Sequence, residues 1–220
     1  MKRYSEIEAL QTILSCAKLY RDYLINRKFM FIYRDKNGSY GHIEVLFRKK
    51  HFMHLTGNTR TDDNTAIHFF SMCIDNTLSV KDIVKSNMMD LKLAVLPSLM
   101  RIHKNARMIG SFKGEPLQQL LTEKLAGHSK GCMGFVFDQD ESFLVPNTTL
   151  YGNTREMIIE NNQIIAVYMA DINAAKYDTL CYIAKNSDIS KKDPLHLVWS
   201  NDIGSKIVSN NLAIDVATIS

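Results

Sequence analysis

A histidine at position 54 is the residue of this 220-residue chain whose type and surroundings most favour acid–base chemistry. An imidazole titrates near neutrality, and His54 stands between a predicted strand and a Thr-Gly turn, where loops present functional groups. His54 is therefore a candidate general acid or base. In the alternative interpretation, His54 only satisfies a backbone carbonyl and anchors the turn.

A lysine and a hydroxyl suit the binding of a phosphate, and the chain offers such a pair in Lys124 and Thr122. The two residues are two positions apart, which places both side chains on one face of a strand. The alternative is a solvated lysine on an outward face. A one-residue slip in strand register would turn the pair inward.

Two polar residues follow Pro146, which fixes the entry to a turn. The Asn147 amide and the Thr148 hydroxyl can donate to an anionic oxygen. Equally, both side chains can bond to their own backbone, as these residue types do in turns. They are candidate site residues on the first interpretation and turn residues on the second.

Two further cations, Arg107 and Lys185, stand at the ends of predicted strands. Either side chain can project at the margin of a sheet, and an arginine offers a bidentate fork to a phosphate. We expect both to bind phosphate groups.

The spacing of cysteines and glycines favours neither a metal nor a nucleotide cofactor. Cys16, Cys73, Cys132 and Cys181 form no C-x-x-C pair and are expected to be reduced, buried thiols. The glycines at 110 and 114 do not have the spacing of a phosphate-binding loop. We therefore expect no cofactor.

Composition is that of a globular protein, with 45% hydrophobic and 23% charged residues. No apolar stretch reaches the length of a membrane helix and no signal peptide is evident, so the expected location is the cytoplasm. Residues 1–130 carry a formal charge of +9 and residues 131–220 one of −5. The basic part suits a polyanion such as a nucleic acid, or it is solvated surface that complements the acidic part.

Helices and a hairpin are predicted before residue 107. Ser5 and Glu8 have capping-box spacing ahead of an amphipathic helix, and residues 29–33 and 43–47 read as the strands of a hairpin. A short helix is predicted over residues 62–73, and another is predicted to begin at residues 79–84. A third is predicted to start near Pro97 and to bury a face that includes His103.

After residue 107 the chain consists of short apolar runs separated by turns. The runs cover residues 108–112, 117–126, 133–137, 143–145, 164–169 and 180–184. Helices followed by an antiparallel meander predict an α+β fold. We expect one domain over residues 1–186 and a peripheral C-terminal extension over residues 187–220.

Six segments, in their order and spacing, resemble a known nuclease group. They are FMHLTG at 52–57, RMIG at 107–110, LTEKLAG at 121–127, CMGF at 132–135, VPNT at 145–148 and YIAK at 182–185. The set is similar to a phage-associated branch of the barnase, EndoU, colicin and RelE group, across roughly residues 29–185. The resemblance implies N-terminal helices followed by a curved, mostly antiparallel sheet.

The resemblance also implies a metal-independent endoribonuclease of phage or mobile-element origin. The RNA 2′-hydroxyl would attack the phosphate, giving a 2′,3′-cyclic phosphate and a 5′-hydroxyl. In this hypothesis His54, Lys124 and Asn147 are catalytic and converge on the scissile phosphate. The remaining candidates bind substrate phosphates, namely Arg107, Thr122, Thr148 and Lys185.

One departure keeps a second hypothesis open. Neither the glutamate–histidine pair of barnase nor the paired histidines of EndoU aligns with this chain, and a fold can persist after activity is lost. The alternative is a catalytically inactive nucleic-acid- or protein-binding module that modulates a host system. A protein inhibitor or a host protein is then a possible partner beside RNA.

Overall fold

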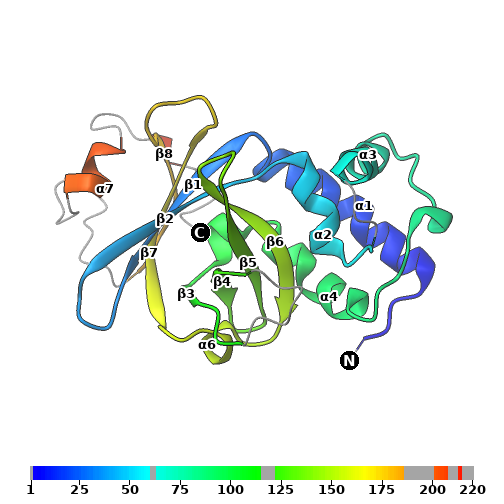
Figure 1. The fold of residues 1–220 in the computed structure, drawn as a ribbon, viewed down its shortest axis with the longest axis horizontal. Helices are drawn as coiled ribbons and strands as arrows, with labels where there is room; N and C mark the ends of the chain where they lie inside the picture. The colour runs from blue at the N-terminus through cyan, green and yellow to red at the C-terminus, as the bar shows by residue number, and fades with distance from the viewer. Residues whose placement is uncertain (1, 60–62, 115–121, 186–200, 208–212, 215–220) are drawn as a thin grey trace.

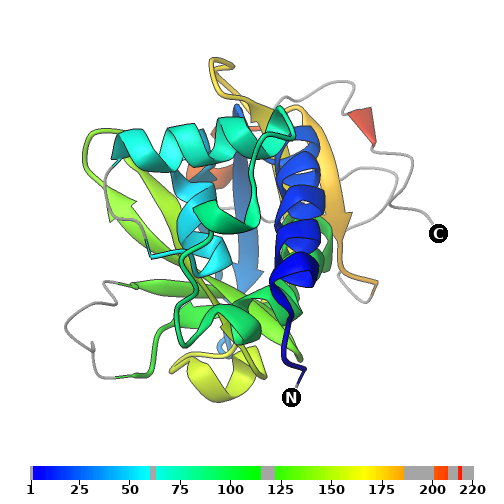
Figure 2. The same ribbon diagram turned by 90° about the vertical axis from the view of Figure 1, so that its right-hand side faces the viewer.

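A layer of helices covers one side of a strongly curved sheet (Figure 1). The computed structural model describes residues 2–59, 63–114, 122–185, 201–207 and 213–214. Seen from the side turned by 90°, α1, α2, α3 and α4 lie in front of the strands (Figure 2). The architecture confirms the predicted α+β class. Within the described residues, no helix has both the length and the apolar character needed to span a membrane.

The helices and strands follow one another in the predicted general order. The α-helices are α1 (Glu6–Tyr23), α2 (Phe52–Thr56), α3 (Asp63–Ile74), α4 (Met89–Leu99), α5 (Ile102–Asn105), α6 (Thr154–Met157) and α7 (Asn201–Ser205). The strands are β1 (Arg27–Arg34), β2 (Tyr40–Leu46), β3 (Met108–Ser111), β4 (Lys124–His128), β5 (Gly131–Asp138), β6 (Phe143–Tyr151), β7 (Asn162–Asp171), β8 (Thr179–Ile183) and β9 (Ala213–Ile214).

The sheet curves until its strands form a ring. Its order is β1-β2-β6-β5-β4-β3-β7-β8-β9, and β1 also pairs with β7. Every pairing between strands of residues 108–183 is antiparallel, as the short, closely joined apolar runs predicted. Parallel pairing occurs between β2 and β6 and between β8 and β9.

The concave face of the sheet carries the main hydrophobic core. Phe31 on β1 and Phe135 on β5 belong to strands that are not neighbours, yet their rings lie 6.5 Å apart. Both side chains are fully buried, together with residues of α1, α4 and α5. The helices therefore close over a sheet face that is already filled with aromatic rings, and this fixes where the helices sit.

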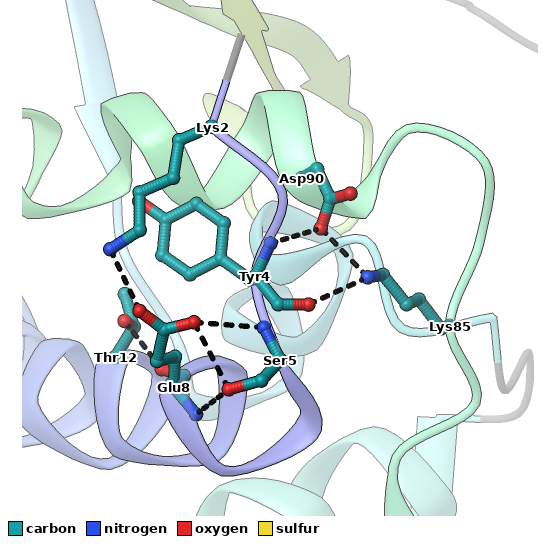
Figure 3. Close-up of polar contacts among 7 residues, drawn as sticks. All are labelled: Lys2, Tyr4, Ser5, Glu8, Thr12, Lys85 and Asp90. Carbon is teal, nitrogen blue, oxygen red and sulfur yellow. Dashed lines mark hydrogen bonds and ion pairs between the residues drawn. The ribbon is translucent and has the colours of Figure 1, made fainter.

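Two sets of hydrogen bonds hold the N-terminal segment, one at the cap of α1 and one at the start of α4 (Figure 3). Ser5 caps α1 by accepting from the Glu8 backbone N–H, and Glu8 accepts from the Ser5 N–H at 2.9 Å, which is the predicted capping box. The Tyr4 N–H donates to Asp90 at 3.2 Å, and Lys85 donates to the Tyr4 carbonyl at 3.0 Å. The start of α1 is thus tied to the start of α4.

The prediction that a helix starts near Pro97 is wrong. The helix α4 starts at Met89, and Pro97 lies in its last turn. A proline has no N–H to donate to the carbonyl four residues earlier, so Pro97 removes one hydrogen bond from α4. The predicted buried face continues in α5, where His103 is 3% exposed and packs against the ring of Phe29.

Two other predicted elements differ in extent. Where a helix was expected to begin, at residues 79–84, the chain forms a short 3₁₀ turn at Val80–Asp82. The strand expected over residues 117–126 begins at Lys124, and residues 117–121 lie outside the described part of the chain. The hairpin and the helix expected over residues 62–73 are confirmed as β1, β2 and α3.

Part of the C-terminal region packs on the convex face of the sheet. Ile203 and Ile207 are 1% and 0% exposed, in a cluster with Met30 of β1 and Tyr168 of β7. The strand β9 extends the sheet beside β8. The division at residue 186 stays a prediction, because residues 186–200 are not described.

All four cysteines are expected to be recovered as free thiols when the protein is denatured without reductant. Cys16, Cys73, Cys132 and Cys181 are buried and form no disulfide, and burial raises the pKa of the first three to about 12. In the native protein they should react slowly, because the thiolate is the reactive form. Thiol titration before and after denaturation checks this, and recovery of two or fewer thiols would contradict it.

Candidate functional site

Three elements meet around His54, the candidate general acid or base. The helices α2 and α4 and the strand β6 pack on one another. The Thr149 hydroxyl of β6 donates to the Leu55 carbonyl of α2 at 2.9 Å, and the Lys92 ammonium of α4 donates to the His54 carbonyl at 2.8 Å. We call this meeting point the α2–α4–β6 junction.

His54 lies in a short helix rather than in the predicted turn between a strand and Thr-Gly. The helix α2 ends at Gly57, whose φ of +84° belongs to the left-handed region that favours glycine. A Cβ on Gly57 would also lie 2.9 Å from the Met89 Cα, so the close approach of α2 to α4 requires glycine there. The Thr-Gly sequence is therefore a helix C-cap, and it leaves His54 half-buried.

A second polar group gathers over Gly134 of β5. The Asn147 amide donates to the Thr122 hydroxyl at 3.2 Å. A Cβ on Gly134 would lie 2.8 Å from the methyl carbons of Thr122 and Thr148 and 3.0 Å from Asn147 Oδ1. Three of the predicted site residues are thus side by side. Because an amide has two N–H donors, Asn147 keeps one for another acceptor.

The two polar groups are joined through β6. Asn147 and Thr148 directly precede Thr149, which bonds to α2 next to His54. A β-bulge between Gly134 and Phe135 disturbs the alternation here, and bulges are common next to functional sites. Thr149 pairs with Met133, which lies in the helix-side core, whereas Thr148 pairs with Gly134, whose Cβ direction is the opposite one. The group of Thr122, Asn147 and Thr148 therefore lies on the other face of the sheet from the Thr149–Leu55 contact, and β6 connects the two.

Lys124 joins neither polar group by any contact among the described residues. Its ammonium donates to the Ser111 hydroxyl of β3 at 2.9 Å, whereas Thr122 bonds to Asn147 of β6. The strands β3 and β6 are on opposite sides of β4 in the sheet. The expected pairing of Thr122 and Lys124 on one strand face is thus not found, because β4 begins only at Lys124.

The other two predicted phosphate ligands lie elsewhere. Arg107 precedes β3, and its guanidinium carbon is 4.2 Å from the centre of the Tyr182 ring. Lys185 is exposed, two residues after β8. Neither contacts His54 or Asn147 within the described residues. Both remain proposals as phosphate contacts away from the junction.

Lys92 is the junction residue that the sequence did not indicate. Burial lowers the pKa of its ammonium from the ordinary value of 10.5 to about 8. No motif surrounds Lys92, and it reaches His54 only because α4 packs on α2. The ammonium holds the backbone of His54 and brings a cation into the junction.

The partial burial of Lys92 predicts a pH dependence of stability. Between about pH 8 and pH 10.5 the unfolded chain holds the Lys92 proton more strongly than the folded protein. The free energy of unfolding should therefore rise with pH in this window, relative to Lys92→Met, which cannot titrate. Urea unfolding of both proteins at the two ends of the window measures this. A difference that is constant with pH would contradict the assignment.

A second polar cluster was not predicted from the sequence, although His42 and Glu44 alternate along β2 and so share one face. Lys206 and the Tyr177 hydroxyl donate to Glu44, the latter at 2.8 Å, and His42 Nε2 lies 3.6 Å from the same carboxylate. The contact with His42 contributes most to a Glu44 pKa of about 2. A carboxylate with so low a pKa is poorly suited to proton transfer at neutral pH. We interpret the cluster as an anchor that holds the segment after α7 against β2.

Comparison with known proteins supports the resemblance noted in the sequence. A family model described as phage-Barnase-EndoU-ColicinE5/D-RelE like nuclease4 matches residues 12–186. Neither a curated protein nor a solved structure gives a significant match. The matched range contains His54, Lys92, Thr122 and Asn147, and it covers most of the chain. The chain therefore belongs to the phage-Barnase-EndoU-ColicinE5/D-RelE like nuclease 4 family.

Proposed function

We propose that the protein is a metal-independent endoribonuclease of phage or mobile-element origin, with its centre at the α2–α4–β6 junction. Family membership supports a nucleic acid as the substrate. The observation that carries the proposal is the hydrogen-bonded pair of Thr122 and Asn147 beside Thr148 of β6, the strand that also bonds to α2 next to His54 through Thr149 and Leu55. An imidazole, an amide and hydroxyl groups are side chains that phosphodiester transesterification can use.

In the proposed reaction, the 2′-hydroxyl oxygen of RNA attacks the adjacent phosphorus. The bond from phosphorus to the 5′-oxygen breaks, and a 2′,3′-cyclic phosphate and a 5′-hydroxyl form. His54 transfers one proton, as the base for the 2′-hydroxyl or as the acid for the 5′-oxygen, and a water molecule accepts or supplies the other. Asn147 and Thr122 donate to the phosphorane oxygens, and Lys92 positions α2 through its bond to the His54 carbonyl.

The remaining candidates belong to the proposal as phosphate contacts. Thr148 is 4% exposed and supports Asn147 from the next position of β6. Lys124, Arg107 and Lys185 lie away from the junction and are assigned to phosphates that flank the scissile bond. The proposal also includes a cytoplasmic location and a protein inhibitor or host protein as a partner.

The test is incubation of the purified protein with a mixed RNA substrate in EDTA, followed by analysis of the product ends. We expect fragments with 2′,3′-cyclic phosphates and 5′-hydroxyls. An all-deoxy substrate of the same sequence is the control and should stay intact, because it has no 2′-hydroxyl. Intact RNA that is nevertheless bound would favour the inactive binding module instead.

A further inference from the structure

A strongly basic pocket lies apart from the junction, between the β1–β2 turn, the starts of β3 and β7, and α6. Its volume is about 470 Å³, within the range of roughly 300–1,000 Å³ that is typical of ligand sites. The lining residues are Arg34, Asp35, Lys36, Arg107, Met108, Arg155, Asn161 and Gln163. Four cations face one carboxylate, so the lining carries a formal charge of +3.

Strand pairing holds the floor of this pocket. On β7, Gln163 pairs with Arg34 of β1 on one side and with Met108 of β3 on the other. Three strands thus present neighbouring side chains at one end of the sheet, along the lower edge in Figure 1. Residues that are distant in sequence form one surface without any movement of the backbone.

Arg107 is fixed in place while most of its donors stay unused. Its Nη1 donates to the Lys104 carbonyl at 2.6 Å and to the Ala106 carbonyl at 3.0 Å, and the guanidinium plane covers the Tyr182 ring. Since a guanidinium has five N–H donors, the three on Nε and Nη2 have no partner within the described residues. A guanidinium that is already ordered loses little side-chain entropy when it binds an anion.

The other charges of the pocket leave it open to an anion. Arg155 and Lys36 are exposed and make no side-chain hydrogen bond or ion pair in the described part of the chain. Asp35 is occupied by the hairpin turn, because its Oδ1 accepts from the Asn37 and Ser39 N–H groups, each at 2.8 Å. The carboxylate therefore shapes the turn and does not pair with these two cations.

We infer that this pocket binds backbone phosphates of a nucleic-acid strand at a distance from the bond that is cut. The inference rests on the proposed function for the class of ligand. Arginine, lysine, asparagine and glutamine side chains are the usual protein donors to phosphate and sugar, and all four types line the pocket. In the ring of strands, β2 separates β6 from β1, so one strand of nucleic acid would have to cross the sheet to reach both sites.

The pocket is tested with Lys36→Gln, Arg107→Gln and Arg155→Gln combined in one variant. The matched control, Lys18→Gln, Lys81→Gln and Lys176→Gln, removes the same charge from exposed lysines outside the pocket. Binding is measured with a fluorescent single-stranded oligodeoxynucleotide, which cannot be cleaved, at several salt concentrations. Lys36→Gln with Arg155→Gln, against Lys18→Gln with Lys176→Gln, repeats the test in case Arg107 is needed for folding.

The pocket variant should bind the oligonucleotide at least roughly tenfold more weakly than the wild type, because it loses several charge-assisted hydrogen bonds. The slope of log affinity against log salt should become shallower by about 2 for three lost contacts to a single strand. The control should keep most of both values. Equal losses in the two variants would overturn the inference, since the effect would then reflect net charge alone.

Two further outcomes separate this inference from the proposed function. If RNA is never cleaved but the pocket variant alone loses oligonucleotide binding, the proposed function fails and the inference stands. If the wild type cleaves RNA and the pocket variant binds as the control does, the inference fails together with the phosphate role of Arg107, and the proposed catalytic centre stands. Binding of polyglutamate in place of the oligonucleotide, with the same loss in the variant, would replace the nucleic acid by an acidic protein.

Discussion

Replacing His54 by alanine should lower the rate of RNA cleavage by roughly 10²-fold or more, which is the usual range for loss of a general acid or base. His54 is half-buried on α2, and two hydrogen bonds, from Lys92 to its carbonyl and from Thr149 to Leu55, fix the helix backbone. Because these bonds use backbone carbonyls, they do not need the imidazole. The variant should therefore keep its fold, and the rate is the quantity that changes.

His68→Ala is the matched control, because His68 is exposed on α3 and belongs to no proposed site. It should cleave RNA at the wild-type rate. His54→Gln is a second variant that retains hydrogen-bonding capacity but cannot titrate, and it should be as inactive as His54→Ala. If His54 has only a structural role, His54→Ala should instead lower the melting temperature, and His54→Gln should restore it. Full cleavage with full stability in His54→Ala would remove this residue from the mechanism.

Replacing Phe135 by alanine should lower the free energy of unfolding by about 3–5 kcal/mol, as for other large buried aromatic residues. The Phe135 ring is fully buried on the concave face of β5. It lies 6.5 Å from both Phe31 of β1 and Phe47, with the second pair edge to face. The ring therefore joins opposite parts of the sheet, and no single neighbour can move to fill the space that it leaves.

Phe137→Ala is the control for this change, since Phe137 is on the same strand but 50% exposed. Its effect should be within about 0.5 kcal/mol, as for ordinary surface substitutions. Urea unfolding with a common slope for the three proteins gives the comparison. A loss of less than 1 kcal/mol for Phe135→Ala, on the order of a surface change, would mean that the concave core is not assembled as described.

Local patterns predicted the elements whose signals lie within a few residues. The Ser5–Glu8 capping box predicted the start of α1, and the turn residues between β1 and β2 predicted the hairpin. Pro97 was misread because a proline is typical of the first turn of a helix, whereas α4 contains it in the last turn. His54 was placed in a turn because Thr-Gly also ends a helix when the glycine adopts positive φ.

Which residues come together in the candidate site was harder to predict than which kinds of residue it contains. Thr122 and Asn147 were identified separately, but their hydrogen bond depends on where β4 and β6 lie on either side of β5. Lys92 carries no local signal, because its lowered pKa comes from the packing of α4 on α2. Tertiary contacts of this kind connect segments that no sequence window contains.

Because the ring of strands closes between β1 and β7, the sheet can be completed only late in synthesis. The strand β1 is made early, yet one of its edges pairs with β7, and the Lys28 side chain donates to the Ala174 carbonyl across 146 residues of chain. Contacts of such long range slow folding. During synthesis, that edge of β1 stays unpaired until β7 has left the ribosome. A protein proposed to cut RNA would thus complete its sheet only after most of its chain has emerged from the RNA-based machine that makes it.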